Sequence, residues 1–440
     1  MTRSFDAVIY GATMAGIVAA KRLAKAGHTS VILEWTSHVG GMITGGFGLT
    51  DRSLAAVWKW GLTHDFFKLI GAQYGLAGPQ WSFAASEARI ALTRFLHADP
   101  RITILTGQRL LRVAKDPATQ QITEVMTATD NFAGKVFLDC SYEGDLAHTS
   151  GVTMISGREG EATDGETWGG QGDAGTQACN FRLMLSKALH RRPWPKPPGY
   201  RREDFLPYLP ALRRRPIATA ECRTHLVGAD RDRYVTTGGD VIGLSNPWQD
   251  YDGRERIKAQ IYYRTAGRLY FQANDPAVPP GDRIFARSLG LCADEFQDDW
   301  YGAPGWPPAL HVRDARRIVG RHVMTTSDMA LAATAQTKPD PIALGGCHGD
   351  DEGGIGRIFQ IPLRSVLPQA GQVTNLIVPV AASVSRAGFM SYRMEPTWML
   401  VAQSCGVLAA IAIASGRPAG LVPYADLRPR LDADGAILSW

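Results

Sequence analysis

The stretch Ala7-Val8-Ile9-Tyr10-Gly11-Ala12-Thr13-Met14-Ala15-Gly16 decides the fold of this 440-residue chain. Its apolar run predicts a buried strand, and its glycines predict a tight turn into an Ala-rich helix over 17–26. A second apolar run, 30–33, ends at the acidic residue Glu34. This order predicts a strand–turn–helix–strand unit, the beginning of an α/β fold with a parallel sheet.

The same unit predicts a dinucleotide site. The N–H groups at a helix N-terminus favour a pyrophosphate, Gly11 permits the sharp turn, and Gly16 lets the helix lie close on the strand. Glu34 follows Gly11 by 23 positions, where an acid accepts hydrogen bonds from a ribose. Thr13 stands where the middle glycine of the fingerprint is expected. Its side chain therefore either obstructs the phosphates or offers them a hydroxyl.

A glycine-rich run follows the acid. Five glycines lie within nine positions, at 40, 41, 45, 46 and 48. Such spacing lets the backbone pass close against a flat ligand and donate its N–H groups there. A merely flexible loop would not explain the apolar side chains that alternate with these glycines, so we expect this run to contact the cofactor.

The segment 6–51 resembles the FAD-dependent oxidoreductase family that groups with glutathione-reductase-like flavoproteins, some of whose members are xanthan-lyase-associated. Three later stretches match the family pattern in the same order: 137–159, which contains Phe-Leu-Asp-Cys-Ser-Tyr-Glu-Gly-Asp-Leu, then 312–320 and 375–406. The resemblance spans most of the chain and implies FAD as the cofactor. It implies no particular substrate, because this fold hosts many reactions.

The turn, the acid, the glycine-rich run and the later matching stretches together give the residues expected to bind FAD. They are Gly11, Thr13, Met14, Ala15, Gly16, Glu34, Trp35, Gly40, Gly41, Met42, Thr44, Gly45, Gly46, Asp139, Glu143, Gly144, Met394 and Glu395. His38 precedes the glycines, and a covalent bond from it to the flavin is the less expected alternative to a simple loop histidine.

The expected fold class is α/β: a glutathione-reductase-like FAD-binding Rossmann domain with a discontinuous second, mixed α+β substrate domain. A chain of 440 residues exceeds what one core usually serves. We expect the FAD domain at 1–160, the substrate domain at 161–345, and the return to the FAD domain at 346–440, ending in an apolar helix. The aromatic residues of 161–345 could line a pocket but more often serve packing.

Composition indicates an ordinary globular enzyme. Apolar residues make up 45% and charged residues 20%, and a net charge of +5 without a polybasic tail does not suggest nucleic-acid binding. The apolar segment 398–414 is interrupted by polar residues and predicts a buried helix rather than a membrane span. Residues 1–4 lead directly into the first strand, so no signal peptide is expected. The six cysteines form no CxxC, which predicts no metal site and a reduced, cytoplasmic setting.

The source of electrons is the next question. A built-in NADPH site usually carries a second glycine fingerprint, yet the glycine clusters at 345–349 and 353–356 are followed by an extended segment closed by Pro362. We therefore expect a small organic substrate to deliver a hydride to the flavin N5, with oxygen or a redox partner as the later acceptor.

Two other functions stay open. Gly-Asp-Leu-Ala-His at 144–148 resembles the Gly-Asp-Ala-Ala-His of aromatic hydroxylases, which suggests a monooxygenase reduced by external NAD(P)H, although the motif lies early in this chain. The arginine-rich region 191–215 suggests an electron-transferring flavoprotein subunit that docks on a partner.

Four residues are candidates for catalysis: Arg386, Arg393, Tyr392 and His348. Family members carry Ser-His where this chain has Ser-Arg at 385–386, and an arginine can only orient or neutralise an anion. Tyr392 and His348 are then the candidate bases. The segment 392–396 begins the last expected helix, whose N-terminus would favour a reduced flavin. Arg393 binds an anionic substrate group or pairs with a carboxylate such as Glu395. His348 lies beside three acids, but no second histidine stands at metal-ligand spacing.

Overall fold

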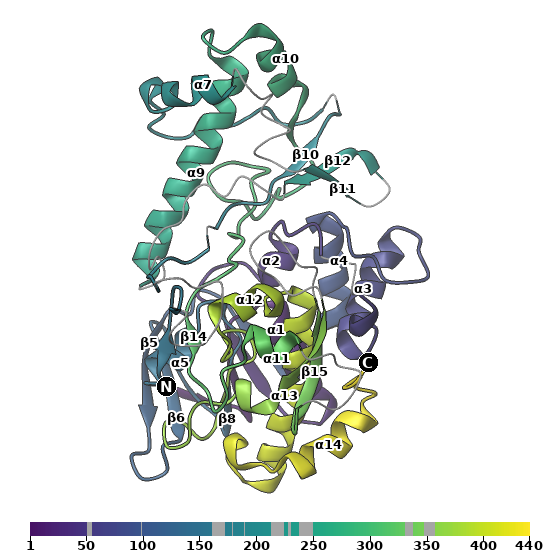
Figure 1. Ribbon diagram of the computed structural model, residues 1–440, viewed down its shortest axis with the longest axis vertical. Coiled ribbons are helices and arrows are strands. Elements are labelled where there is room, and N and C mark those ends of the chain that lie inside the picture. Colours follow the sequence, from purple (N-terminus) through teal and green to yellow (C-terminus); the bar gives the residue numbers. More distant parts are fainter. Residues whose placement is uncertain are drawn as a thin grey trace.

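A computed structural model describes residues 1–50, 55–97, 99–160, 172–177, 179–188, 190–212, 224–227, 230–236, 250–330, 338–346 and 357–440. These residues form two lobes (Figure 1). The sheet lobe comprises the described residues of 1–177 and 312–440, and the second lobe comprises those of 179–311. The long helix α9 (Tyr251–Asn274) runs from the second lobe down to the sheet lobe.

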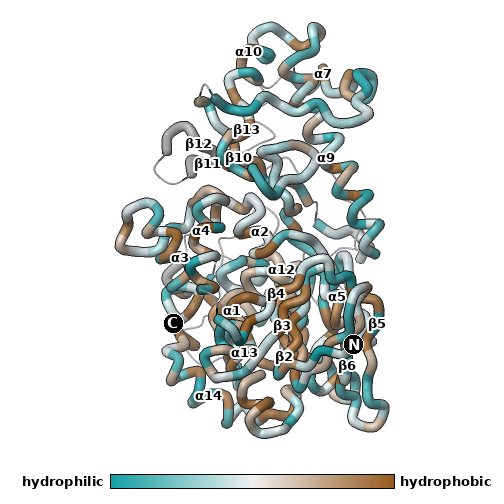
Figure 2. Tube along the Cα trace, turned by 180° about the vertical axis from the view of Figure 1, so that it is seen from behind, coloured by the Kyte–Doolittle hydropathy of each residue, from teal (hydrophilic) through white to brown (hydrophobic). Residues whose placement is uncertain are grey.

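A five-stranded parallel sheet forms the centre of the sheet lobe, in the order β17-β8-β2-β3-β4. All residues of the three inner strands β8, β2 and β3 are buried, as expected for strands covered on both faces. Figure 2 shows β2 and β3 as hydrophobic segments. The strands are β2 (Ala7–Tyr10), β3 (Ser30–Leu33), β4 (Ile102–Leu105), β8 (Val136–Asp139) and β17 (Leu376–Ile377).

Two apolar helices, α1 (Met14–Lys25) and α13 (Glu395–Ser415), pack against each other in the core. They approach closely because Gly406 carries no side chain: a Cβ there would lie 3.0 Å from the Ala19 carbonyl oxygen. The predicted strand–turn–helix–strand unit and the predicted buried helix are both confirmed. By length and hydropathy α13 could cross a membrane, but 83% of its most apolar window is buried inside the protein.

Further elements surround this core. A second sheet, β1-β7-β6-β5, lies beside the parallel sheet, and helix α14 follows α13, so the expectation that α13 ends the chain is wrong. The remaining elements of this lobe are β1 (Thr2–Ser4), α2 (Gly41–Thr44), α3 (Gly61–Gln73), α4 (Ala85–Leu96), β5 (Leu110–Lys115), β6 (Ile122–Thr127), β7 (Asn131–Ala133), α5 (Asp145–Thr149), β9 (Met154–Ile155), β14 (Arg317–Ile318), α11 (Thr326–Ala330), β15 (Pro341–Gly346), β16 (Ile358–Pro362), α12 (Arg386–Tyr392), α14 (Tyr424–Ala433) and the 3₁₀ turns Ala55–Trp58, Leu363–Ser365 and Ala419–Leu421.

The second lobe is mixed α+β. Its sheet has the order β11-β12-β10-β13, and helices α9 and α10 pack together beside it. Its other elements are β10 (Met184–Ser186), α7 (Leu209–Leu212), β11 (Thr224–Val227), β12 (Asp230–Thr236), α10 (Pro280–Ser288), β13 (Gly290–Leu291) and the 3₁₀ turns Arg202–Asp204 and Leu206–Tyr208.

The chain returns to the sheet lobe earlier than the expected boundary at residue 345. β14 pairs with β9 and β15 pairs with β16, and Met324, Ile342 and Leu344 join the core around α13. Strand pairing across distant segments decides this boundary, and no local sequence signal marks such pairing.

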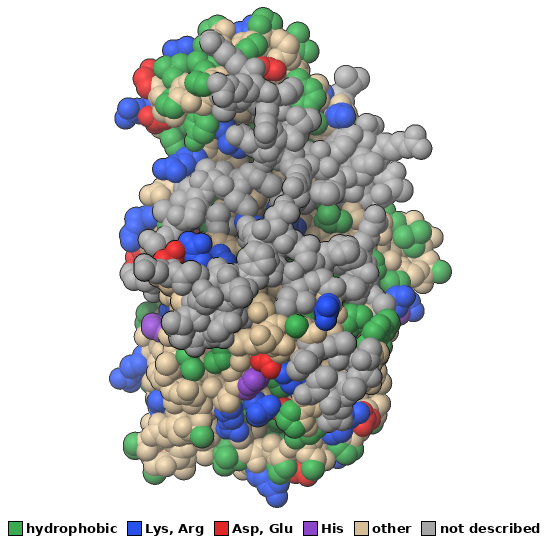
Figure 3. All heavy atoms as spheres, in the orientation of Figure 1, with side chains coloured by type: hydrophobic (Ala, Val, Ile, Leu, Met, Phe, Trp, Pro, Cys, Tyr) green, Lys and Arg blue, Asp and Glu red, His purple; other side chains and the backbone are tan. Residues whose placement is uncertain are grey.

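Most aromatic residues of the second lobe serve packing. Tyr262 and Trp306 meet edge to face with ring centroids 5.0 Å apart, and both are buried in the core of this lobe. Figure 3 shows lysine and arginine side chains dispersed over the described part of one face of the molecule.

Candidate cofactor and active site

The turn between β2 and α1 is built for close approach of a ligand. Gly11 has φ +100°, and a Cβ there would lie 2.6 Å from the Ser141 backbone nitrogen. Thr13 is the N-cap of α1: its hydroxyl accepts from the Gly16 N–H at 3.3 Å and donates to the Cys140 carbonyl at 2.8 Å. The Thr13 side chain thus holds the turn together. The N–H group of Ala15, in the first turn of α1, has no intrahelical acceptor and remains available to an anion.

Glu34 lies at the carboxyl end of β3, as predicted, and is almost fully buried. One carboxylate oxygen accepts from the Ala12 N–H at 2.9 Å, and the other accepts from the backbone and hydroxyl of Thr36 at 2.9 and 2.8 Å. Burial raises the pKa of Glu34, although these hydrogen bonds oppose the shift. The carboxylate therefore supports the turn and lines the adjoining pocket.

The glycine-rich run approaches the segment after β8. Gly41 has φ +56°, and a Cβ there would lie 2.2 Å from the Tyr142 hydroxyl oxygen. That hydroxyl accepts from the Met42 N–H at 2.9 Å and donates to a carboxylate oxygen of Glu395 at 2.5 Å. Tyr142 thus links the glycine run to the first turn of α13.

A pocket of about 690 Å³ lies where these elements meet. This volume includes space that is open to solvent. Both lobes supply its walls: the sheet lobe contributes the turn, the acid and the glycine run, and the second lobe contributes helix α9 and the segment before β14. The lining residues are Gly11, Thr13, Glu34, Trp35, Thr36, His38, Gly41, Ser141, Tyr142, Glu143, Arg254, Lys258, Pro308, Ala309, Leu310 and Val312.

A buried cluster of charges lies beside this pocket. Arg254 from α9 binds both carboxylate oxygens of Asp145, and Arg316 binds the same carboxylate as well as the Glu143 carbonyl. Burial raises the pKa of Glu143 to about 7, with Arg254 opposing the shift. A protonated Glu143 leaves the arginines in excess over Asp145, so this wall suits an anionic ligand.

The residues present fit FAD. The turn that a Cβ would fill, the helix N-terminus and the cationic wall suit the phosphates of a dinucleotide, and the Glu34 carboxylate lines the same pocket as an acceptor. Of the predicted residues, Gly11, Thr13, Glu34, Trp35, Gly41 and Glu143 line the pocket, while Met14, Ala15 and Gly16 form the first turn of α1, and Gly40 and Met42 flank Gly41.

Some predicted cofactor residues have a structural role instead. Asp139 is fully buried, accepts from Ser141 and from the Ala147 N–H, and so caps α5; burial raises its pKa to about 6. Gly144 is the left-handed N-cap of the same helix. Met394 is the N-cap residue of α13. These three residues were predicted because they are neighbours of other site residues in the sequence. The direction in which each one points depends on the helix that follows it.

His38 is held from both sides. One ring nitrogen lies 2.6 Å from a carboxylate oxygen of Asp299 in the second lobe, and the other lies 2.9 Å from the Gly41 carbonyl oxygen. The second nitrogen also lies 3.0 Å from the Thr44 hydroxyl, so protein groups engage both ring nitrogens. A ring so engaged favours the loop-histidine interpretation over a covalent bond to flavin.

Glu395 is 1% exposed, and its second carboxylate oxygen has no hydrogen-bond partner among the described residues. Burial raises its pKa from 4.5 to about 7. Between pH 4.5 and about 7 the unfolded chain loses this proton while the folded chain keeps it. Glu395 therefore lowers the free energy of unfolding progressively as the pH rises through this window, and the whole penalty is present above about pH 7.

Replacing Glu395 by glutamine should therefore increase the free energy of unfolding of the apoprotein relative to wild type, and the gain should grow as the pH rises through this window. Urea unfolding at a series of pH values measures it. The exposed Glu203→Gln is the control and should show no such trend. A gain that is constant with pH would contradict the buried-proton interpretation.

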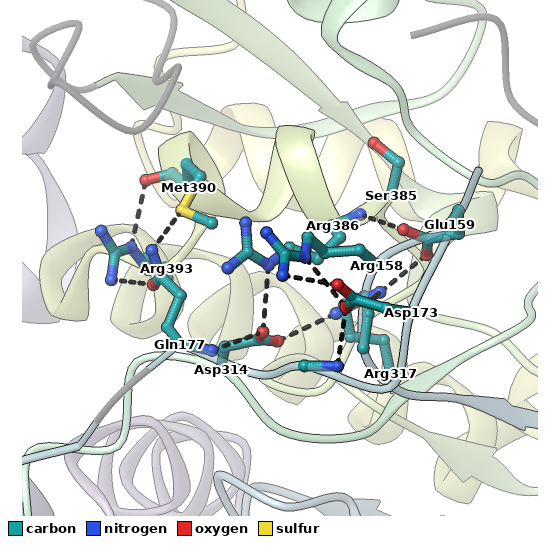
Figure 4. A network of polar contacts seen from close by, with 12 residues as sticks. Arg158, Glu159, Asp173, Gln177, Asp314, Arg317, Ser385, Arg386, Met390 and Arg393 are labelled. Atoms are coloured by element: carbon teal, nitrogen blue, oxygen red, sulfur yellow. Dashed lines mark hydrogen bonds and ion pairs between the residues drawn. The ribbon is translucent and has the colours of Figure 1, made fainter. Parts of the chain in front are cut away.

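Two of the four catalytic candidates, Arg386 and Arg393, have different partners (Figure 4). Arg386 follows the N-cap Ser385 of α12; its N–H donates to Glu159 at 2.9 Å and its Nε to Asp314 at 3.3 Å. Arg393 donates to Gln177 and to the Met390 carbonyl rather than to Glu395, so the ion pair considered for Arg393 and Glu395 is not formed.

Tyr392 is not suited to act as a base, and that prediction is wrong. It is fully buried, and its hydroxyl donates to the Pro379 carbonyl at 2.5 Å. Burial raises its pKa well above the usual value, which keeps it protonated. Its side chain turns into the core because it closes the last turn of α12. His348 lies outside the described residues.

A narrow gap, too small for a water molecule, lies against the glycine run. Its lining residues are Met42, Gly45, Gly46, Phe47, Arg182, Ala309, Leu310 and His311. Burial, together with the charges of Arg182, Arg313 and Arg393, holds the pKa of His311 well below its usual value. His311 is therefore a neutral imidazole beside the cofactor-binding segment. Thr44, predicted to bind the cofactor, instead donates to the Val39 carbonyl at 2.7 Å and fixes this loop.

Sequence reasoning missed His311, Arg254 and Lys258. His311 directly precedes the family-like stretch 312–320, and this neighbourhood was an available signal. Arg254 and Lys258 are four positions apart and so share one face of α9. Nothing local to 250–274 indicates that this face meets the sheet lobe.

Comparison with known proteins gives a family match. Residues 6–431 match the family described as FAD dependent oxidoreductase. No curated protein matches significantly. Among solved structures, thioredoxin reductase of T. acidophilum is similar at 24% identity over 31% of this chain and 35% of that chain, with a TM-score of 0.21. AlpK is 13% identical over 58% of this chain and 48% of that chain, with a TM-score of 0.30.

NikD, an unusual amino acid oxidase essential for nikkomycin biosynthesis, is 12% identical over 42% of this chain and 58% of that chain, with a TM-score of 0.26. The chain thus spans less than two thirds of each of these solved proteins. The parallel sheet with its glycine turn is an α/β fold of the Rossmann type. Since the family match covers nearly the whole chain, the protein belongs to the FAD dependent oxidoreductase family, and its cofactor is FAD.

Proposed function

We propose that this protein oxidises or dehydrogenates a small organic substrate by hydride transfer to the flavin N5. FAD supplies the hydride acceptor when it is bound. We also propose a glutathione-reductase-like domain arrangement, in which the second lobe covers the substrate. The proposal is supported by the two ends of the chain, which together build the sheet lobe, and by the second lobe, which supplies part of the pocket wall.

One observation carries the proposal. Within the described ranges, only one parallel sheet carries a glycine turn followed by a helix, namely β2, α1 and β3. The expected extended segment after 357 is the strand β16, which pairs antiparallel with β15. No second dinucleotide fold is therefore present in that part of the chain, which favours the substrate as the electron source.

His311 is our candidate for the base in place of Tyr392. Removing a hydride from the carbon that bears a hydroxyl or amino group requires a base that takes the proton of that group. A neutral imidazole can accept that proton, and burial, together with the nearby arginines, keeps His311 neutral at ordinary pH. His311 also lies against the glycine run.

Arg386 is our candidate for binding an anionic group of the substrate. Arg158, Arg317 and Arg386 alternate with the carboxylates of Asp173, Glu159 and Asp314, and Arg393 adjoins them (Figure 4). Burial lowers the pKa of Arg386, as do the charges of Arg317 and Arg158, while Asp314 opposes the shift. A carboxylate ligand would relieve this unfavourable environment.

Anaerobic reduction of the yellow holoprotein tests the function. We expect 2-hydroxy or 2-amino carboxylates to bleach the flavin, their uncharged amides to bleach it poorly, and NADPH alone to leave it oxidised. Arg386→Gln should raise the KM for the carboxylates by about tenfold or more, because a charge-assisted contact is lost, and should leave the amides unaffected. Rapid bleaching by NADPH alone would indicate the monooxygenase instead. Reduction only by a protein partner would indicate the electron-transferring subunit.

A further inference from the structure

The FAD pocket has walls from both lobes, and helix α9 is firmly seated on the sheet lobe. The Tyr251 hydroxyl lies 2.5 Å from the hydroxyl of Tyr10 in β2 and 3.2 Å from the Leu110 nitrogen. The Arg254 guanidinium stacks 5.6 Å from the centroid of the Trp35 ring and binds Asp145. The first turns of α9 therefore have one fixed position over the pocket.

Lys258 follows Arg254 by one helical turn on the same face and lines the pocket. It is half-buried, and its ammonium lies 4.4 Å from the centroid of the Tyr301 ring. A ring face orients a cation but does not neutralise it. Arg254, in contrast, already has Asp145 as its counter-ion.

Lys258 has no such counter-ion. No carboxylate in the part of the chain that the structure describes lies within 4.0 Å of its ammonium. Burial lowers the pKa of Lys258, although the more distant Glu255, Asp299 and Glu34 oppose the shift. A partly buried cation without a partner is unfavourable in the free protein, and a bound anion would remove this penalty.

We propose that Lys258 binds the diphosphate of FAD from the second lobe, opposite the turn of β2 and α1, so that the cofactor holds the two lobes together. The diphosphate carries two negative charges, and the turn supplies only N–H groups and a helix dipole toward it. Among the described residues that line the pocket, Arg254 is paired with Asp145, and Lys258 supplies a positive charge that no carboxylate within 4.0 Å neutralises. The inference rests on the FAD cofactor and not on the proposed reaction.

Equilibrium titration of the apoprotein with FAD, ADP and adenosine tests it. Lys258→Met keeps the apolar stem and removes the charge, so the affinity for FAD and ADP should fall by about tenfold while that for adenosine stays unchanged. Lys258→Arg should restore the binding of both diphosphates. Added salt should reduce the difference in FAD and ADP affinity between wild type and Lys258→Met. Arg256→Met, on the exposed face of α9, is the matched control and should bind like wild type.

Three results would overturn the assignment. Unchanged ADP affinity in Lys258→Met would exclude the contact. An equal loss of ADP and adenosine would indicate a damaged pocket, and an equal loss in Arg256→Met would indicate the general charge of the helix. Lys258→Gln replaces Lys258→Met if circular dichroism shows that the latter does not fold. Because all readouts are binding constants, the absence of substrate oxidation would not affect the outcome.

Discussion

Replacing Arg254 by methionine is expected to lower the free energy of unfolding of the apoprotein by about 3 kcal/mol or more, because it leaves a buried carboxylate short of its main partner. Arg254 and Asp145 are 3% and 6% exposed, and the guanidinium binds both carboxylate oxygens. Arg316 keeps one contact with Asp145 but cannot replace the bidentate pair. Urea unfolding followed by circular dichroism measures the loss.

Arg109→Met is the matched control. Its guanidinium also lies over the Tyr251 ring, at 5.8 Å from the centroid, but its partner Asp252 is 74% exposed. Exposed ion pairs contribute little, so this variant should unfold almost like wild type. Adding Asp145→Asn to Arg254→Met removes the buried carboxylate but leaves the buried Arg316 without its counter-ion, so the double variant should stay less stable than wild type. If Arg254→Met and Arg109→Met lowered the free energy of unfolding equally, contact with Tyr251, and not the buried charge, would stabilise α9.

Local sequence signals were sufficient for the cofactor half of the fold. One βαβ unit contains all of its own signals: the apolar runs of β2 and β3, the turn at Gly11 and the acid Glu34. The periodicity and spacing of these residues were therefore enough to predict the unit. The buried helix α13 is equally local, since a long apolar run with a glycine packed on Ala19 has few other possible environments.

Side-chain direction and contacts between lobes could not be predicted in this way. Tyr392 and Arg393 are neighbours in sequence, yet the first turns into the core and the second turns toward Gln177. The wall that Arg254 and Lys258 form depends on how α9 lies across the sheet lobe, which is a long-range packing result. The contacts of the Thr13 hydroxyl also depend on the distant Cys140 carbonyl, which no local sequence signal indicates.

Replacing Gly11 by alanine is expected to give apoprotein that takes up no FAD. Alanine is strained at φ +100°, and its Cβ would lie 2.6 Å from the Ser141 nitrogen and 2.7 Å from the Cys140 carbonyl carbon. Both neighbours are backbone atoms, so the turn itself must move, and the pocket wall that Gly11 and Ser141 share moves with it. Flavin absorbance per protein after purification, and FAD titration of the apoprotein, measure the loss.

Gly27→Ala separates the two causes. Gly27 also has a left-handed backbone, with φ +88°, but an added Cβ would meet no atom within 4 Å. It should therefore lose about 1 kcal/mol of stability from backbone strain and keep a normal flavin content. If Gly27→Ala lost FAD as completely as Gly11→Ala, strain in the βαβ unit would account for both variants. Normal flavin content in Gly11→Ala would show that the turn tolerates a side chain, and the pocket would then not depend on close backbone approach at this position.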